Sequence, residues 1–266
     1  MRILANEAAL KRMIRENDDV LLYLDKRRSY LVKVERGKKL HTHKGFINIE
    51  DLLGREYGTC IRSSKGVKFV AFHPTIRDYI FKISRRTQII YPKDIAFIIF
   101  FSGIGPGSRV VEGGTGAGAL AAAIASYVKP SGRVYSYEIR EEFLKIAAKN
   151  FKRIGIADYI ELKKGDLTKK IEEKDVDAVI LDLSTPWLVV SHAYEALKGS
   201  GFFVSFSPTI DQVVKTKEAL IESGFAGIET FETLFRGMQI EKGRTRPETL
   251  MTGHTGYITI ARKATI

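Results

Sequence analysis

The 266-residue sequence contains a single cysteine, Cys60, and no long uninterrupted apolar run. One cysteine excludes an internal disulfide framework and a zinc site built from several cysteines. No apolar stretch approaches the roughly 20 residues that a membrane-spanning helix needs. The first residues also lack the pattern of a secretory signal peptide. We therefore expect a cytoplasmic protein with no membrane segment.

The charge of the chain is unevenly distributed. Hydrophobic residues make up 44% and charged residues 28%, which is the composition of a globular protein. The net charge is +12, and residues 1–94 carry +10 of it, with 21 Lys and Arg against 11 Asp and Glu. A block of positive charge on one domain is typical of a polyanion binder. A lysine-rich surface that only maintains solubility is the plainer alternative.

Short alternating segments characterise the first ninety residues. They predict five strands, at 20–24, 29–34, 45–49, 59–63 and 68–72. Such spacing indicates a small β-barrel or sandwich, whereas the segment 75–84 fits either a loop or a short helix. His41 and His43 form a His-x-His pair that no carboxylate or cysteine cluster accompanies. We therefore expect an exposed strand there and no metal site.

Strand and helix patterns alternate in the rest of the chain. Pro92 interrupts the joint at 84–94, and Asp94 is expected to cap an apolar helix at 95–101. Strands are predicted at 109–112, 133–138, 159–163, 177–182 and 201–206, and helices at 119–128, 140–154, 186–197 and 210–223. The last two strands, 228–235 and 255–261, have little room for a helix between them, so one should run antiparallel. The alternation predicts an α/β, doubly wound, mostly parallel sheet.

A glycine-rich stretch follows the first predicted strand of this sheet. Its glycines allow φ > 0 and a close approach of the backbone to a ligand. Gly114, Gly116 and Ala119 fit the Gly-x-Gly-x-x-Ala pattern of dinucleotide-binding folds. Glu112, Gly114, Gly116 and Gly118 instead fit motif I of the S-adenosylmethionine methyltransferases. A glycine-rich turn without a ligand is the third interpretation.

Acidic residues stand at or just beyond the ends of four predicted strands: Glu112, Glu138, Asp166 and Asp182. Ligands of open α/β sheets bind at this edge. Glu138 comes about 20 residues after the glycines, where a carboxylate accepts hydrogen bonds from a ribose diol. Asp166 is placed to accept a hydrogen bond from an adenine amino group, with Phe143 or Leu167 against the ring. NAD gives Asp166 no clear task, so the acids favour S-adenosylmethionine.

The segment DLSTPW at 182–187 lies where amino-methyltransferases carry Asp/Asn-Pro-Pro-aromatic. Its carboxylate, Asp182, is expected near the reactive methyl group. There it would hold an exocyclic amine while a ring nitrogen attacks, so that catalysis is mostly positioning. Trp187 either lines the target pocket or anchors the core.

Several segments together resemble the tRNA (adenine-N1)-methyltransferases: QIIYPKD at 88–94, RVYSYEIR at 133–140, RTRPE at 244–248 and GHTGY at 253–257. The resemblance covers about residues 84–263. It implies a Rossmann-like class I S-adenosylmethionine-dependent methyltransferase that modifies T-loop adenines of tRNA, at position 58 and in some archaeal members also 57. It further implies a homotetramer, a small β-rich basic RNA-binding domain over 1–90, and a catalytic domain over 91–266.

The resemblance also implies a set of site residues. Those expected at the cofactor are Gly114, Thr115, Gly116, Ala117, Gly118, Ala119, Leu120, Glu138, Phe143, Asp166, Leu167 and Asp182. Asp182 and Tyr91 would be catalytic, with Tyr91 stacked on the target adenine and Trp187 beside it. Arg244 and Arg246 would reach RNA phosphate or the target pocket, unless they form a structural ion pair with Glu248.

The sequence departs from the family at a few positions. Ser184 and Thr185 replace a proline and an acid, Phe206 replaces a common tyrosine, and Gly113 replaces an alanine. These departures concern base positioning more than cofactor binding. Two alternatives stay open. One is a methyltransferase of the same fold with another substrate, and the other is a non-catalytic RNA-binding subunit of a heteromer.

Overall fold

The computed structural model describes residues 13–85 and 88–265. Residues 1–12, which hold the expected start of the first domain, and 86–87 of the predicted joint lie outside the described residues. The chain divides into two compact units, the first ending at Lys82 and the second beginning at Ile83. This division falls a few residues before the domain boundary expected after residue 90.

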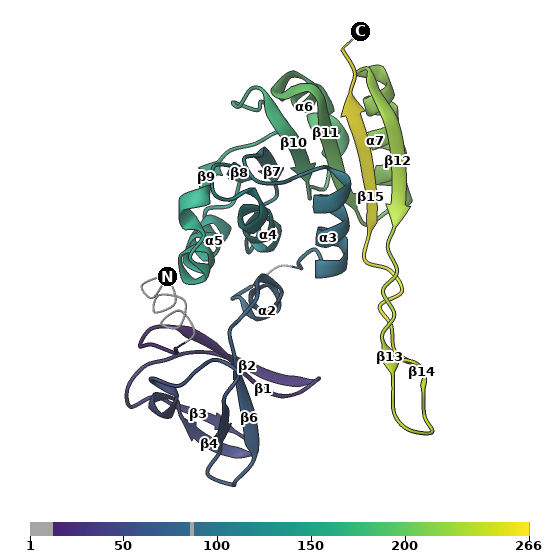
Figure 1. Ribbon diagram of the computed structural model, residues 1–266. Coiled ribbons are helices and arrows are strands. Elements are labelled where there is room, and N and C mark those ends of the chain that lie inside the picture. Colours follow the sequence, from purple (N-terminus) through teal and green to yellow (C-terminus); the bar gives the residue numbers. More distant parts are fainter. Residues whose placement is uncertain (1–12, 86–87, 266) are drawn as a thin grey trace, which may run out of the picture. The chain divides into compact units, whose positions relative to one another are not determined.

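The described part of the N-terminal unit is a small β structure that ends in helix α2 (Figure 1). Its antiparallel sheet has the order β2-β1-β6-β5, and β3 and β4 form a separate hairpin. The bounds are β1 Asp19–Asp25, β2 Arg28–Lys33, β3 Lys39–Thr42, β4 Gly45–Asn48, the 3-10 helix η1 Ile49–Leu52, β5 Cys60–Arg62, β6 Lys68–Phe72 and α2 Ile76–Lys82. Alternate residues of β1 and β6, such as Val20, Leu22, Phe69 and Ala71, are fully buried. This is the period-two pattern of a strand with one face in a core.

The five strands predicted from the alternating pattern are present. The exposed strand expected around His41 is present as well, as β3. The ambiguous segment 75–84 contains helix α2. His41 lies on β3, and the His43 ring nitrogen Nε2 lies 2.8 Å from Arg28.

The C-terminal unit is built on a seven-stranded sheet with the order β12-β15-β11-β10-β7-β8-β9. The bounds are β7 Arg109–Gly113, β8 Arg133–Glu138, β9 Ile160–Lys164, β10 Val176–Leu181, β11 Leu197–Ser207, β12 Phe225–Glu232 and β15 Tyr257–Lys263. β7, β8, β9, β10 and β11 pair in parallel, and β15 runs antiparallel to both β11 and β12. The predicted doubly wound α/β sheet with one antiparallel strand is confirmed.

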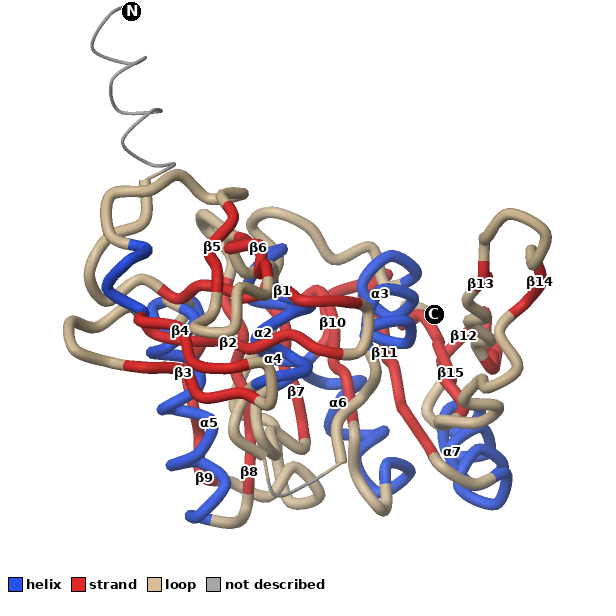
Figure 2. The backbone as a smooth tube through the Cα atoms, turned by 90° about the horizontal axis from the view of Figure 1, so that it is seen from below, coloured by secondary structure: helices blue, strands red, loops and turns tan. Residues whose placement is uncertain are grey.

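Helices cover both faces of this sheet (Figure 1). The bounds are α3 Pro92–Phe101, α4 Ala119–Val128, α5 Glu141–Ile154, α6 Val190–Ala196 and α7 Ile210–Glu222. α3, α4 and α5 lie on one face, α6 and α7 lie on the other, and Figure 2 shows α7 beside β12 and β15. The small side chains of α4 are almost all buried, which allows this helix to pack closely on the sheet. Among the described helices, none has the length and hydropathy that crossing a bilayer would require.

The predicted helix at 186–197 is two elements. A 3-10 helix, η3 Pro186–Val189, precedes α6, and the strand predicted at 201–206 begins earlier, at Leu197. A second 3-10 helix, η2 Ala157–Tyr159, leads into β9. The capping role expected of Asp94 was wrong, because α3 begins at Pro92 and its N-cap is Tyr91.

Asp94 instead belongs to a buried polar cluster. Its carboxylate is fully buried and accepts hydrogen bonds from the hydroxyls of Thr233 and Thr255 and from the Lys93 ammonium at 2.8 Å. Lys93 also donates to Thr255 Oγ1 at 2.6 Å. Thr233 follows β12 and Thr255 precedes β15. The first turn of α3 therefore holds the two strand ends together.

Between these two ends the chain forms an arm that leaves the sheet (Figure 1). It contains the short antiparallel strands β13 Met238–Gln239 and β14 Arg246–Pro247. Large apolar side chains along it are exposed: Leu234, Phe235, Met238, Ile240, Leu250 and Met251. A run of exposed apolar residues marks an interaction surface in a folded protein.

Candidate cofactor and active site

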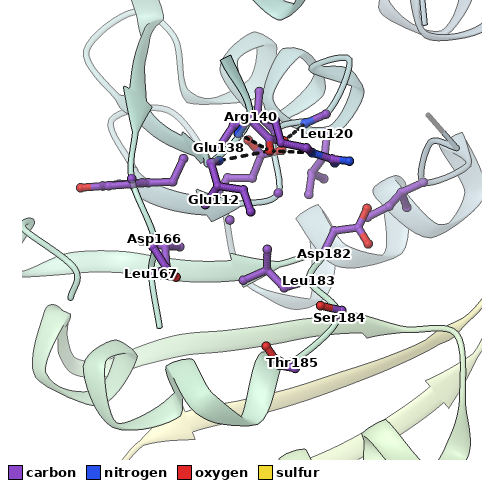
Figure 3. A pocket seen from close by; sticks show the side chains of 18 of the residues that line it. Glu112, Leu120, Glu138, Arg140, Asp166, Leu167, Asp182, Leu183, Ser184 and Thr185 are labelled. Carbon is purple, nitrogen blue, oxygen red and sulfur yellow. Dashed lines mark hydrogen bonds and ion pairs between the residues drawn. The ribbon is translucent and has the colours of Figure 1, made fainter. Parts of the chain in front are cut away.

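A cavity of about 680 Å³ lies at the carboxyl ends of β7, β8 and β10. Such a volume is that of a small-ligand site. It is lined by residues 88–90, 112–117, 119–120, 137–140, 165–168 and 182–185 and by Leu188. Figure 3 shows that Glu138, Asp166 and Asp182, from three different segments, border this one cavity. The topology of the sheet therefore brings together acids that are far apart in sequence.

The glycine loop joins β7 to α4 and forms one wall of the cavity. Gly114, Gly116 and Gly118 all have positive φ, at 93°, 52° and 85°. A Cβ on Gly114 would lie 2.2 Å from the Asp182 carbonyl oxygen, and one on Gly118 would lie 2.3 Å from the Phe151 ring. The backbone conformation thus favours glycine at all three positions, and close packing adds to this requirement at Gly114 and Gly118.

We expect Gly114→Ala to abolish cofactor binding and to destabilise the protein. The left-handed φ alone costs about 1–3 kcal/mol, and the Cβ would also displace the Asp182 backbone. Gly155→Ala is the matched control, because Gly155 has a φ of 75° and nothing within 4 Å of its Cβ position. Thermal unfolding and calorimetry of S-adenosylmethionine binding measure both effects. Equal behaviour of the two variants would contradict the close-packing role.

Glu138 is buried at the end of β8 and is fixed by its surroundings. Its Oε2 accepts the Gly116 N–H at 3.1 Å, and its Oε1 accepts the N–H groups of Ile139 and Arg140 at 3.1 Å each. The Arg140 side chain adds an ion pair at 3.3 Å. These contacts orient the side-chain oxygens of Glu138 against the glycine loop, where they can accept further hydrogen bonds from a ligand diol.

Asp166 and Leu167 lie in the loop after β9. Thr168 donates its N–H and its hydroxyl to Asp166 Oδ1, at 3.0 and 2.7 Å. These hydrogen bonds hold the pKa of Asp166 below its usual value, so the side chain is an anionic acceptor at neutral pH. Leu167 is buried and offers an apolar contact in the same wall of the cavity.

Asp182 follows β10 and donates its backbone N–H to Gly113 O at 2.9 Å. Solvent reaches its side chain through the mouth of the cavity, yet the cavity walls replace much of the surrounding water. This desolvation raises the pKa of the Asp182 carboxyl to about 6. The group is therefore mainly ionised at pH 7 and can accept a hydrogen bond.

Glu112 is buried within β7, and among the four strand-end acids it is the one with an unpaired buried oxygen in the described residues. Burial raises the pKa of its carboxyl to about 7, against the opposing effect of the Ser136 hydroxyl, which donates to it. Thr115 Oγ1 lies 2.6 Å from Ser136 Oγ and continues the chain of hydrogen bonds into the glycine loop. Glu112 Oε1 has no hydrogen-bond partner among the described residues. Glu112 therefore supports the glycine loop through Ser136 and Thr115, and its Oε1 remains an unpaired hydrogen-bond acceptor.

Several of the predicted site residues do not line the cavity. Gly118 packs on Phe151, and Phe143 is buried with the Arg140 guanidinium 3.9 Å from its ring centre. Trp187 lies on η3, where the Lys215 ammonium is 5.0 Å from its ring centre.

Three more predicted site residues are not among the residues that line the cavity. Tyr91 is 39% exposed at the start of α3, directly after the lining residues 88–90. Arg246 lies on the arm and donates to Thr249 Oγ1 at 2.6 Å, and Arg244 lies in the turn before it.

The cavity also contains residues that the sequence did not single out. Arg140 and Thr168 orient two of the acids, and residues 88–90 form part of the wall. The departures at 184–185 are lining residues too, and Gln212 donates to Ser184 O at 2.9 Å. The Gln212 side chain, from α7, thus supports Ser184, the position at which the family commonly has a proline.

The residues of the cavity fit S-adenosylmethionine. The fixed carboxylate of Glu138 suits a ribose diol, and the anionic Asp166 suits an adenine amino group. The glycine loop leaves the backbone open to close approach, and the acids Glu112 and Asp182 suit a cationic centre. Each polar part of such a ligand has a partner of matching chemistry.

Comparisons with known proteins agree with this geometry. Residues 68–246 match the family described as the tRNA methyltransferase complex GCD14 subunit, and residues 13–61 match the TrmI-like N-terminal family. A tRNA (adenine(57)-N(1)/adenine(58)-N(1))-methyltransferase TrmI from Methanocaldococcus jannaschii is 40% identical over 268 residues, covering 91% of this chain and 94% of its own.

Two solved structures are similar along nearly the whole chain. A SAM-dependent O-methyltransferase from Thermotoga maritima is 38% identical with a TM-score of 0.92, covering 97% of each chain. The tRNA (m1A58) methyltransferase TrmI from Aquifex aeolicus is 29% identical with a TM-score of 0.84, covering 96% of this chain and 100% of its own. The chain therefore belongs to the tRNA (adenine-N1)-methyltransferase family, with the fold of class I S-adenosylmethionine-dependent methyltransferases.

Proposed function

We propose that this protein methylates N1 of adenine 58 in the T loop of tRNA, and adenine 57 as well, as the name of the Methanocaldococcus relative describes for that enzyme. The observation that carries the proposal is the convergence of Glu138, Asp166 and Asp182 on one cavity, in a chain of this family. S-adenosylmethionine is the methyl donor of this class.

Asp182 is proposed as the catalytic residue. Bound S-adenosylmethionine supplies an electrophilic methyl group. The Asp182 carboxylate accepts a hydrogen bond from the adenine N6 amine and so directs the N1 lone pair into the cavity. Because methylation at N1 places positive charge on the base, the same carboxylate would stabilise the transition state in which this charge develops.

The target base and the RNA backbone are proposed to meet four further residues. Tyr91 would stack on the adenine, which its exposure beside lining residues 88–90 supports. Trp187 would contact the base from the segment that directly follows Thr185. Arg244 and Arg246 would bind phosphate from the arm, where their side chains are exposed.

The remaining proposals concern organisation. The +10 charge of residues 1–94 supports an RNA-binding role for the domain over 1–90. The exposed apolar side chains of the arm support self-association, and we propose a homotetramer. Analytical ultracentrifugation that shows only monomers at micromolar concentration would contradict this state. The cytoplasmic location stays a prediction.

The methylation rate should depend on pH through Asp182. Its carboxyl must be ionised to accept the N6 hydrogen bond, and its pKa is raised to about 6. The kcat/KM for tRNA, which reports ionisations of the free enzyme, should therefore fall about tenfold per pH unit below pH 6. Rates measured from pH 5 to 8 show this limb, and Asp182→Asn should lack it. A wild-type rate that stays constant down to pH 5 would contradict the assignment.

Single substitutions in the substrate test the proposed position. An unmodified tRNA transcript is expected to take up label from S-adenosylmethionine. Replacing either adenine 58 or adenine 57 should reduce the label, and replacing both should abolish it. Undiminished label in the doubly substituted transcript would reject the T-loop site. The transcripts should be refolded and checked by melting, so that loss of label reflects the base and not the RNA fold.

A further inference from the structure

The N-terminal unit contains a second cavity, of about 940 Å³, that no feature of the methyl-transfer site uses. Its walls come from β1, the turn after it, the residues around β6, and α2. It shares no lining residue with the cofactor cavity. A cavity in a strongly basic unit is suited to binding an anionic ligand.

Aromatic side chains form one side of this cavity. Leu21 of β1 pairs with Phe72 of β6, so Tyr23, two residues further along β1, projects from the same face of the sheet as Phe72. The rings of Tyr23 and Phe72 lie 5.7 Å apart, and Phe72 remains 41% exposed. Phe81 of α2 also lines the cavity and is 39% exposed. Large rings left half open to solvent at a cavity wall are suited to stacking on a flat ligand.

Positive charge surrounds these rings. Lys26, Arg27, Arg77 and Lys82 line the cavity, against one acid, Asp78. Asp78 accepts hydrogen bonds from the N–H and hydroxyl of Thr75, at 2.9 and 2.6 Å, so its carboxylate is engaged within its own turn.

One of these cations lies close to an aromatic face, and another is anchored to the backbone. The Arg77 guanidinium lies 5.5 Å from the centre of the Phe81 ring, and the Lys82 ammonium donates to Ser29 O at 2.8 Å. The excess of cations makes the cavity a site for an anion that carries a flat group.

We infer that this cavity binds an unpaired nucleotide of the RNA substrate, with its base stacked on Phe72 and its phosphate held by Arg77 and Lys82. Aromatic faces combined with Lys and Arg are the chemistry by which proteins hold single-stranded nucleic acid, since every base offers a stacking face and every nucleotide a phosphate. An acidic peptide would use the cations but not the exposed rings. The inference rests on the proposed function, because it takes RNA as the substrate.

Binding of an unmodified tRNA transcript to full-length variants tests the inference. Phe72→Ala should weaken tRNA binding about 5- to 150-fold, as expected for the loss of one stacked base. The slope of log affinity against log salt should not change, and Phe72→Tyr should restore the affinity. Arg77→Ala should instead lower that salt slope by about one, because one phosphate contact is lost. A purely structural role would not separate the two variants in this way.

Phe46→Ala is the matched control, because Phe46 is an exposed aromatic residue of the same unit that lies outside the cavity. The tRNA affinity of Phe46→Ala should stay near wild type. All variants should also keep the S-adenosylmethionine affinity and the melting temperature of the wild-type protein. Wild-type affinity in both Phe72→Ala and Arg77→Ala, in a protein that methylates tRNA, overturns this inference alone. A wild-type protein that binds no tRNA overturns the proposed function with it.

Discussion

Replacing Asp182 with alanine is expected to reduce methyl transfer to tRNA by about 10²- to 10⁴-fold, the usual contribution of a positioned acid–base group. The substitution removes the only proposed acceptor for the adenine N6 amine and the charge that balances the methylated base. S-adenosylmethionine affinity should change far less, because we propose Glu138 and Asp166 as the partners of its diol and amino groups. Single-turnover rates at saturating tRNA and calorimetric cofactor binding measure the two effects separately.

Two further variants sharpen this result. Asp182→Asn keeps the shape of the side chain, so a loss as large as that of alanine would show that the negative charge is needed. Asp211→Asn is the control, because Asp211 is an exposed acid in the first turn of α7 and lies outside the cavity. A full rate in Asp182→Ala with normal cofactor binding would remove Asp182 from the catalytic site.

Replacing Glu138 with glutamine is expected to weaken S-adenosylmethionine binding about 10- to 150-fold, which is the range for hydrogen bonds to a charged group. The carboxylate accepts the N–H groups of Gly116, Ile139 and Arg140. An amide offers one acceptor oxygen in place of two and turns donor hydrogens towards these N–H groups. The substitution should therefore disturb the conformation of the glycine loop and weaken the hydrogen bonds to the ribose diol. Isothermal calorimetry gives the dissociation constant directly.

Glu141→Gln provides the matched control for Glu138. Glu141 lies three residues further along, is largely exposed, and pairs with Lys164 at 3.2 Å outside the cavity. Its loss should leave cofactor affinity unchanged, since surface ion pairs contribute little. Unchanged affinity in Glu138→Gln would contradict the placement of the ribose at this carboxylate.

The sheet could be predicted because its elements carry strong periodic patterns. Each core strand is a short buried run, α5 is amphipathic, and glycines mark the turn that connects β7 to α4. The lack of a helix pattern between the last two strands indicated that one of them runs antiparallel, and the structure identifies it as β15. The arm could not be predicted, because β13 and β14 are two residues each and carry no period. Its base depends on the buried contacts of Asp94 with Thr233 and Thr255, which are about 140 and 160 residues away in sequence.

The site was predictable to the extent that strand ends meet at one edge of a sheet. This rule brought Glu138, Asp166 and Asp182 to one cavity. It could not show that Glu112 is buried below the glycine loop, because burial depends on the packing of β7 against its neighbours. Nor could it find Arg140, whose contact with Glu138 arises from the local turn into α5.

The central claim is that the methyl group reaches N1 of a tRNA adenine, and nucleoside analysis tests it most directly. The protein is incubated with an unmodified tRNA transcript and labelled S-adenosylmethionine, and the RNA is digested to nucleosides and separated. We predict that the label elutes as N1-methyladenosine. Label on a ribose oxygen, as the name of the Thermotoga relative would suggest for an oxygen acceptor, or cofactor binding with no label on RNA, would contradict the account.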